Sequence, residues 1–387
     1  MSDTPAIDGV CDPRFVRVRD AFAENFRLHY EVGATVAASV DGAPVVDLWG
    51  GWTDATRARA WRRDTLVNVF SAAKPLAAVA VLSLAERGAI DLDLPVARYW
   101  PEFAAAGKDT VTVRMLLSHR AGLPAIRPPL PPLAMYDWSC MTAALASETP
   151  WWEPGRAHGY HVNTFGFLAG ELVRRASGDS VGTFVRGAIT GPLGADLHVG
   201  LAPQHERRAA VYLFPPGIAT IAEALFDAEA GDDADRRHFL RRVYFNPPGI
   251  SGFGTVDTPA WRAAEMPSTN GYGNARALVR FYEALLGTAG ARLLQPETLD
   301  EAIRDAAAGP DVVLGRLSRF GLGFQLSAPE HPFGPNARSF GHYGAGGSVG
   351  FADPDRRLAF AYTTNRPGPR RRNPRPRALI DAVYASF

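Results

Sequence analysis

The sequence predicts an α+β fold, within the broad α/β class, in which both ends of the chain build one antiparallel sheet. Alternating strand patterns occur before about residue 50 and return after residue 320, whereas residues 90–290 mostly show helical spacing. Strands at both ends with helices between them indicate a mainly helical insertion into a sheet domain. We therefore expect a discontinuous sheet domain of residues 1–75 and 290–387, and a helical domain of residues 76–289.

The first predicted elements are a helix and a hairpin. Apolar residues at helical spacing (Phe15, Val18, Phe22 and Phe26) predict a helix over Pro13–His29. Strands over Gly33–Val40 and Val45–Trp49 follow, and the Asp41-Gly42 dipeptide between them is typical of a two-residue hairpin turn.

The later elements follow from the same two periodicities. We expect helices over Ala72–Arg87, Gly166–Ser177, Ala275–Leu286 and Arg377–Phe387, and strands over Phe320–Leu326, Phe340–Gly344, Ser348–Asp353 and Leu358–Thr364.

Composition and charge are those of an ordinary globular protein. The 387 residues are 47% hydrophobic and 21% charged, and the formal net charge is +1. So small a charge gives no reason to expect nucleic acid or an anionic membrane as a partner. The basic segment Arg366–Arg377 lacks interleaved aromatics and is interpreted as a solvated loop. No apolar run approaches the roughly 20 residues of a membrane span.

The N-terminus and the cysteines bear on location. Residues 1–5 lack the basic and apolar stretches that mark a signal peptide. Cys11 and Cys140 form no disulfide framework, which is consistent with a reducing compartment. We expect a cytoplasmic protein that is a monomer or a homodimer.

The use of lysine is the most informative feature of the chain. Of the 41 lysine and arginine residues, only Lys74 and Lys108 are lysines. Arginine cannot be deprotonated in a protein, whereas a buried lysine can lose its proton and act as a base. Lys74 follows Ser71 by three residues, and Ser-x-x-Lys at the start of a helix is used by serine acyl-transfer enzymes. The spacing therefore predicts Ser71 as a nucleophile.

The position of Pro75 supports this interpretation. Proline is tolerated only in the first turn of a helix, which places Ser71 at the helix N-terminus. Ser71 and Lys74 would then share a face, and the Ser71 N–H would be available to an oxyanion. Taken alone, the pattern also fits a helix cap followed by a surface lysine.

Two further segments supply groups for the same chemistry. Tyr160 is predicted at a loop-to-helix junction, where a cationic Lys74 would lower the pKa of the phenol toward that of a general base. A packing tyrosine is the simpler alternative. The run Gly341–Gly347 is predicted as a glycine-rich strand edge, which a substrate can approach closely and which can present a second oxyanion-binding N–H.

Together these motifs resemble those of the serine β-lactamase/penicillin-binding superfamily, nearest to class C β-lactamases and family VIII carboxylesterases. Ser71-x-x-Lys74 is similar to the first motif, Tyr160 to the tyrosine of the second, and His342-Tyr343-Gly344 to the third. The segments Gly88–Asp93, Tyr99–Phe103 and Val113–Leu123 also match, and the likeness runs from about residue 13 onward. The resemblance implies a β-lactamase/DD-peptidase-like fold with the active site in the cleft between the two domains.

The resemblance also implies an acyl-enzyme mechanism on a small-molecule ester. Ser71 would attack the carbonyl carbon, Lys74 and Tyr160 would share the Ser71 proton, and the backbone N–H groups of Ser71 and Ala345 would hold the oxyanion. Which of Lys74 and Tyr160 is the base stays open, because the pair would titrate as a unit. We expect no cofactor and no metal.

Five residues are candidates for substrate binding. His342, Tyr343 and Gly344 follow from the third motif. Trp152 is one of several aromatic residues that suggest an apolar pocket. Asn270 can point into the cleft or cap a helix, and the sequence fits both.

Two departures from the class C pattern bear on the substrate. Class C lactamases carry Tyr-x-Asn, whereas position 162 is valine and Asn163 comes one residue late. His342 replaces a lysine and carries little charge at neutral pH. The lost groups suit a β-lactam or peptide, so we expect a carboxylesterase for short- to medium-chain acyl esters. The alternatives are a related acyl-enzyme activity (amidase, D-aminopeptidase, weak β-lactamase or acyltransferase) and a catalytically silent peptide-binding protein.

Two other patterns invite different assignments. Residues 346–350 spell Gly-x-Ser-x-Gly around Ser348, but strand and turn residues follow where a nucleophile elbow requires a helix. His158 and His161 have the spacing of metal ligands, but no third ligand completes a site. We expect Ser348 to be structural and both histidines to be loop residues near a pocket.

Overall fold

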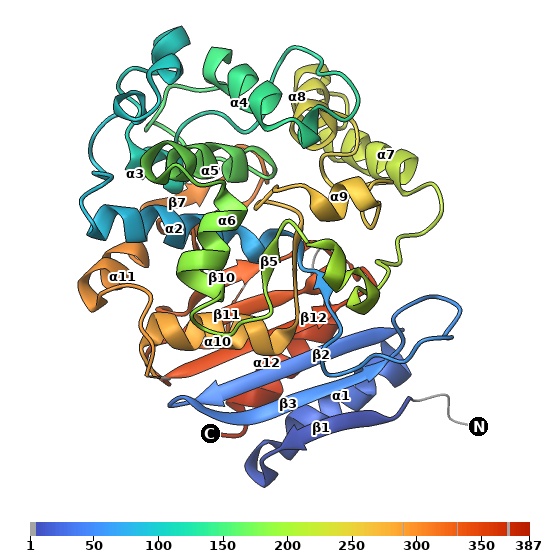
Figure 1. Ribbon diagram of the computed structural model, residues 1–387. Helices are drawn as coiled ribbons and strands as arrows, with labels where there is room; N and C mark the ends of the chain where they lie inside the picture. Colours follow the sequence, from blue (N-terminus) through green and yellow to red (C-terminus); the bar gives the residue numbers. More distant parts are fainter. Residues whose placement is uncertain (1–4, 289, 331, 370–371) are drawn as a thin grey trace.

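A nine-stranded antiparallel sheet forms the base of the molecule, and most helices lie above it (Figure 1). The computed structural model describes residues 5–288, 290–330, 332–369 and 372–387. In sheet order the strands are β1 (Ile7–Cys11), β3 (Ala43–Gly51), β2 (Gly33–Val40), β12 (Leu358–Thr364), β11 (Val349–Asp353), β10 (Phe340–Tyr343), β9 (Gln325–Leu326), β8 (Leu317–Phe320) and β7 (Ala307–Pro310).

The two ends of the chain meet at the centre of this sheet. Strand β2 from the N-terminal part pairs with β12 from the C-terminal part, with Val40 opposite Leu358 and Ala34 opposite Thr364. The prediction of an antiparallel sheet built from both ends is therefore confirmed. The predicted hairpin is also present, because Asp41 and Gly42 both adopt positive φ (54° and 78°) between β2 and β3.

The helices separate into two groups around the sheet. Helices α1 (Val16–Leu28) and α12 (Pro374–Tyr384) cover one face, and α10 (Ala275–Leu286) packs on β2, β11 and β12 from the other. The remaining helices are α2 (Lys74–Glu86), α3 (Val113–Leu117), α4 (Trp138–Ser147), α5 (Thr164–Ser177), α6 (Val181–Val185), α7 (Ile218–Ala230), α8 (Ala234–Phe245), α9 (Pro259–Ala263) and α11 (Pro296–Ala302).

Residue size along β12 explains the packing of the two faces. Phe360 and Tyr362 point into the core beneath α1 and α12, whereas Ala359 and Ala361 between them face the core that contains α10. Small residues on the α10 side let this helix lie close to the sheet. Gly350 on β11 serves the same purpose, since an added Cβ would come 2.7 Å from the Tyr282 ring of α10.

Short elements account for most differences from the sequence prediction. The strand expected over Phe320–Leu326 is two short strands, because Gly321 lies against the Ala302 carbonyl and Gly323 turns the chain with φ of 82°. A second sheet of β4 (Val67–Asn68), β6 (Gly271–Gly273) and β5 (His198–Val199) was not predicted, since strands this short have no periodicity.

Two expectations about the chain ends can be compared with the structure. The basic segment Arg366–Arg377 is not simply a solvated loop: Arg375 is 2% exposed and pairs with Glu31, while residues 370 and 371 lie outside the described residues. Residues 1–4 also lie outside them.

Within the described ranges, every helix is too short or too polar to cross a membrane. The domain boundaries at residues 75 and 290 stay a prediction.

Candidate active site

Ser71 lies in a 3₁₀ turn, η2 (Phe70–Ala73), that leads directly into α2. The α-helix begins at Lys74 with Pro75 in its first turn, as the proline predicted. Phe70 adopts a left-handed conformation (φ 49°), which is strained for a non-glycine residue, and Val69 is held by a hydrogen bond to the Gly271 carbonyl (2.8 Å). This local geometry leaves Ser71 half-buried while residues 72–82 are fully buried.

Lys74 is fully buried and contacts Ser71. Its Nζ lies 3.1 Å from Ser71 Oγ, 2.6 Å from the Val162 carbonyl oxygen and 3.0 Å from that of Ser268. Burial lowers the pKa of Lys74 well below its usual value. The Ser71 hydroxyl donates to the same Ser268 carbonyl (3.3 Å). A neutral amine has two hydrogens for the two carbonyls and one lone pair, which can accept the Ser71 proton once the hydroxyl turns toward Nζ.

Tyr160 reaches the same point from the loop before α5. Its ring centroid lies 4.8 Å from Lys74 Nζ, and the ring stacks on Phe320 with centroids 5.7 Å apart. The buried hydroxyl makes no hydrogen bond of ordinary geometry to any described residue. Burial raises the pKa of Tyr160, and the nearby Ser71 hydroxyl only partly opposes this rise.

The electrostatics of this pair differ from the sequence expectation. A cationic Lys74 was expected to lower the pKa of the Tyr160 phenol, whereas the pKa of Tyr160 is raised and that of Lys74 is lowered. The cause is common to both, because complete burial disfavours the charged form of an amine and of a phenol alike.

The glycine-rich strand edge packs against the turn that carries Ser71. An added Cβ on Gly344 would lie 2.2 Å from the Val69 carbonyl oxygen, so the two backbones touch. Beyond it, η8 (Ala345–Gly347) begins, and the exposed Ala345 accepts a hydrogen bond at its carbonyl from the Tyr212 hydroxyl (3.1 Å). The Tyr212 ring contacts Phe70, with centroids 4.8 Å apart, and so links Ala345 to the segment next to Ser71.

His342 and Tyr343 point to opposite faces of β10. The buried His342 ring lies 5.7 Å from the Tyr160 ring, and its Nδ1 is 2.7 Å from the Tyr343 carbonyl oxygen. Tyr343 instead stacks on Phe333 and donates its hydroxyl to the Pro332 carbonyl (2.8 Å). Because neighbouring residues of a strand alternate between faces, only His342 faces the candidate site, and the Tyr343 side chain does not.

The other two substrate-binding candidates differ in their placement. Trp152 is half-buried, donates Nε1 to the Ala157 carbonyl (3.1 Å) and packs on the hydrophobic cluster that contains Tyr160. Asn270 is fully buried, and its side chain binds the backbone of Trp261, Ala264 and Met266. These contacts use the amide for local structure, and we leave Asn270 out of the proposed substrate contacts.

The alternative motifs have structural partners. Ser348 is buried, its Oγ accepts a hydrogen bond from the Thr364 N–H (3.4 Å), and strand β11 follows it. His158 contacts Ser318 Oγ (2.9 Å). His161 lies between the Gly159 carbonyl (2.7 Å) and the Leu123 N–H (3.0 Å), and burial lowers its pKa to about 4.

Two residues near the site were not singled out as site residues in the sequence analysis. The buried carboxylate of Asp311 accepts hydrogen bonds from the Tyr160 N–H (3.1 and 3.2 Å) and from Ser318, and so fixes the backbone of Tyr160. His119 is buried in edge contact with the Tyr160 ring (5.2 Å) and adopts a positive φ of 61°. Asp311 belongs to no short motif, and His119 lies within the matching segment Val113–Leu123 but had no role assigned to it, since each reaches Tyr160 only through the tertiary fold.

One group of side chains has metal-ligand geometry. Among the described residues, the ligand atoms of Asp196, His198 and His205 lie within 4.8 Å of one another. The guanidinium of Arg208 forms an ion pair with Asp196 and lies 2.8 Å from His205 Nδ1. A cation of the chain itself therefore already neutralises Asp196.

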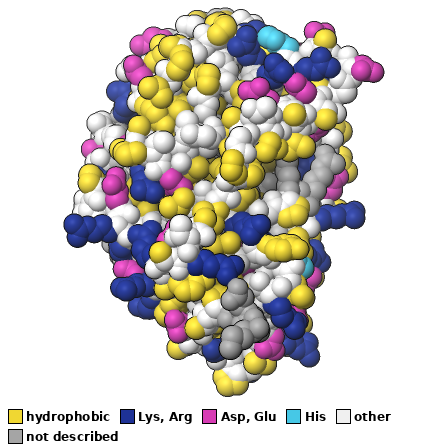
Figure 2. Space-filling view, turned by 90° about the vertical axis from the view of Figure 1, so that its right-hand side faces the viewer, with side chains coloured by type: hydrophobic (Ala, Val, Ile, Leu, Met, Phe, Trp, Pro, Cys, Tyr) yellow, Lys and Arg dark blue, Asp and Glu magenta, His cyan; other side chains and the backbone are white. Residues whose placement is uncertain are grey.

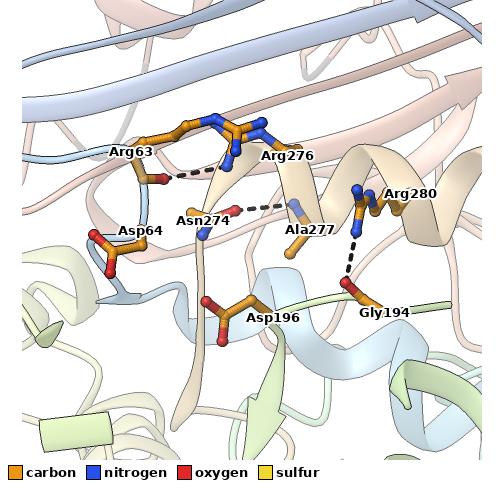
Figure 3. A pocket seen from close by; sticks show the side chains of 8 residues that line it. All are labelled: Arg63, Asp64, Gly194, Asp196, Asn274, Arg276, Ala277 and Arg280. Carbon is orange, nitrogen blue, oxygen red and sulfur yellow. Dashed lines mark hydrogen bonds between the residues drawn. The ribbon is translucent and has the colours of Figure 1, made fainter. Parts of the chain in front are cut away.

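A cavity of about 270 Å³ lies apart from Ser71, between α10 and the loops before β4 and β5 (Figure 3). Its lining is charged, and two of its arginines already have partners: Arg276 binds Asp47 outside the lining (2.6 and 2.8 Å), and Arg280 binds the Gly194 carbonyl (2.6 Å). The lining residues are Arg63, Asp64, Gly194, Asp196, Asn274, Arg276, Ala277 and Arg280, none of which was predicted as a site residue.

The chain is similar to known proteins over most of its length. The family model described as Beta-lactamase matches residues 20–384. The chain is 36% identical to esterase/beta-lactamase LipL of Mycobacterium tuberculosis over 367 residues. This alignment covers 92% of this chain and 82% of LipL.

Solved structures extend the likeness over the whole chain. A family VIII carboxylesterase of known crystal structure has 39% sequence identity to this chain. The two structures superpose with a TM-score of 0.88 over 99% of this chain and 100% of that one. A penicillin-binding protein homologue from Caulobacter crescentus is 38% identical, with a TM-score of 0.89 and the same coverage. The predicted fold class is thereby confirmed, and the chain belongs to the Beta-lactamase family.

Proposed function

We propose that the protein is a serine carboxylesterase that hydrolyses short- to medium-chain acyl esters through an acyl-enzyme on Ser71. The observation that carries this proposal is the contact of 3.1 Å between Ser71 Oγ and the buried Lys74, whose pKa is lowered. A lysine with a lowered pKa can serve as a base near neutral pH.

In the first half of the proposed reaction, Lys74 Nζ takes the Ser71 proton as Oγ attacks the ester carbonyl carbon. The N–H groups of Ser71 and Ala345 stabilise the oxyanion that forms. The bond to the alcohol oxygen then breaks, and this oxygen takes a proton from Tyr160, whose raised pKa keeps the phenol protonated. Lys74 returns its proton to Tyr160, and the acyl group stays on Ser71.

In the second half, a water molecule attacks the acyl carbon and passes a proton to the Lys74–Tyr160 pair. The bond between the acyl carbon and Ser71 Oγ then breaks, Oγ takes a proton from this pair, and the carboxylic acid is released. The buried Tyr160 hydroxyl supports this role, since buried polar groups ordinarily have a partner, and among the described residues this one has only the nearby Ser71 hydroxyl, with no hydrogen bond of ordinary geometry. In the proposed cycle, the partner is the leaving alcohol or the incoming water.

Two considerations support ester over amide or β-lactam substrates. His342 is buried where the resemblance places a lysine, so the site lacks that fixed positive charge for a substrate carboxylate. Several relatives with likeness over most of the chain are described as esterases or carboxylesterases, although the name of LipL also includes β-lactamase and another full-length neighbour is described as a penicillin-binding protein homologue. The assignment to family VIII and a cytoplasmic location are part of this proposal.

Hydrolysis of p-nitrophenyl esters by the wild type, Ser71→Ala and Ser348→Ala tests the proposal. We expect Ser71→Ala to lose at least about a thousandfold in kcat/KM, in line with removal of a nucleophile, and Ser348→Ala to retain most activity. A chromogenic cephalosporin measured in parallel should be turned over far more slowly than the esters. Loss of activity in Ser348→Ala with retention in Ser71→Ala would contradict both the nucleophile and the mechanism.

A further inference from the structure

A row of aromatic side chains runs from the residue before Ser71 toward helix α7. It consists of Phe214, Phe253 and Phe245, which we call the aromatic row. The ring centroid of Phe214 lies 6.2 Å from that of Phe70 and 5.8 Å from that of Phe253, and Phe253 lies 5.7 Å from Phe245. These rings come from three separate segments of the chain, so the row is a product of the tertiary fold.

The aromatic row adjoins the candidate active site at both ends. Phe214 contacts Phe70, the direct neighbour of Ser71. Phe245 and Phe253 pack on the hydrophobic cluster that contains Tyr160, together with Val162, whose carbonyl accepts a hydrogen bond from Lys74. At one end the row therefore touches the residue before Ser71, and at the other end it packs on the hydrophobic cluster that includes Tyr160.

Buried neighbours hold the aromatic row in place from behind. Phe226 of α7 stacks on Tyr244 of α8 with centroids 3.9 Å apart, and Phe245 contacts the edge of Phe226 at 5.8 Å. Gly252, next to Phe253, fits closely against Phe70, because an added Cβ would lie 3.0 Å from the Phe70 ring. The row is thus a supported surface.

The three rings of the aromatic row are themselves only partly buried, unlike Phe70, Phe226 and Tyr244. Partly exposed aromatic rings beside a nucleophile are typical of a surface that a ligand covers. Burial of a hydrocarbon group there would increase binding by about fourfold per methylene group removed from water.

We infer that the aromatic row binds the apolar hydrocarbon group of the ester and makes the enzyme selective for esters that carry one. This inference rests on the proposed function, because it takes Ser71 as the reacting group. The acyl chain and the alcohol chain share this chemistry, and the experiment below distinguishes them.

A second apolar surface lies on the outer side of α7 and provides the control. Ile221 and Leu225 are 42% and 63% exposed, opposite the buried Phe226. Figure 2 shows hydrophobic side chains scattered among charged ones on the face of the molecule that includes α7. Leu225→Ala therefore removes apolar surface from the same helix without touching the aromatic row.

The test compares two substrate series in the wild type, Phe253→Ala, Phe245→Ala and Leu225→Ala. One series varies the acyl chain of p-nitrophenyl esters from acetate to hexanoate, and the other varies the alcohol chain of acetate esters. The quantity compared is the ratio of kcat/KM for the longest to the shortest substrate within each protein. This ratio does not depend on the folded fraction of a variant.

We expect kcat/KM to rise along one series by up to about fourfold per methylene in the wild type and in Leu225→Ala. The slope should flatten in Phe253→Ala or Phe245→Ala, and the series that responds identifies the bound group. Flat series in the wild type, slopes unchanged in both phenylalanine variants, or an equal loss in Leu225→Ala would overturn the inference. The Ser71→Ala variant separates the two proposals. If it kept its esterase activity, the proposed function would be wrong and the inference about the aromatic row with it. If it is inactive but kcat/KM does not change along either substrate series, only the inference about the aromatic row is wrong.

Discussion

The two lysines of the chain show how a single residue type divides between structure and chemistry. Both are fully buried. Lys108 Nζ donates to three carbonyl oxygens, those of Ala105 (2.6 Å), Ala146 (2.9 Å) and Glu148 (2.5 Å), which satisfy all three hydrogens of an ammonium group. Lys74 has two carbonyl acceptors and the Ser71 hydroxyl. The rarity of lysine pointed to both residues, and only the Ser-x-x-Lys spacing separated them.

The lowered pKa of Lys74 leads to a prediction about pH. In the proposed mechanism the active form carries a neutral Lys74, so kcat/KM should hold at alkaline pH and fall as the pH drops through the lowered pKa of Lys74. Lys74→Arg should lose about 10²–10⁴-fold in kcat/KM, because an arginine cannot give up its proton. A pH–rate profile of ester hydrolysis measures both effects.

Lys108→Arg is the matched control for this substitution. It changes the other buried lysine, so it should lower thermal stability but leave the acid limb of the pH profile in place. If Lys74→Arg kept more than a tenth of the wild-type activity, the assignment of Lys74 as the base would be wrong.

At the scale of elements, long periodic segments were predictable and close contacts between short ones were not. The helix over Ala275–Leu286 and the strand over Leu358–Thr364 have the predicted bounds, because each shows its period over several turns or pairs. The contact of β10 with η2 could be anticipated only as a glycine-rich edge, since its partner comes from residues some 270 positions earlier. The strand faces of His342 and Tyr343 also required the register with β11.

Gly344→Ala should damage activity through this contact. Gly344 has ordinary extended backbone (φ −97°, ψ 156°), so alanine is not excluded by conformation. Its Cβ would, however, lie 2.2 Å from the Val69 carbonyl oxygen, which must push β10 away from the turn that carries Ser71. A displacement of this size between the two proposed oxyanion donors should lower kcat on the order of 100-fold.

Gly187→Ala provides the comparison, because Gly187 is exposed, helical and has open space around the position of a Cβ. It should leave kcat unchanged and keep or slightly raise the melting temperature. Steady-state kinetics with a thermal melt distinguish the two variants. Unchanged kcat in Gly344→Ala would show that the spacing of β10 and η2 is not critical.

At the scale of the whole molecule, the sequence predicted the meeting of the two chain ends but not the groups that hold them together. Strand patterns at both ends predicted one antiparallel sheet, whereas the order of its nine strands comes from the structure. Glu31 and Arg375 gave no signal, because a buried ion pair between residues so distant in sequence has no local pattern. For the same reason Asp311, which fixes Tyr160, was missed, whereas Ser71 and Lys74 were found through their spacing within one turn.

The Glu31–Arg375 pair therefore carries the last prediction. The Arg375 guanidinium binds the Glu31 carboxylate at 3.0 Å, with side-chain exposures of 2% and 0%, and Thr364 of β12 donates to the same carboxylate (2.6 Å). Arg375→Ala leaves a buried carboxylate without its counterion and should lower the free energy of unfolding by about 3–5 kcal/mol. The double variant Glu31→Gln/Arg375→Met should lose less, because no charge stays buried.

Arg377→Ala is the control. Arg377 lies two residues after Arg375 on the same helix and forms an exposed ion pair with Asp381, and its loss should cost under about 1 kcal/mol. Urea unfolding at neutral pH gives all three values. If Arg375→Ala proved no more costly than Arg377→Ala, the buried pair would not be what joins α12 and β12 to the N-terminal part of the sheet.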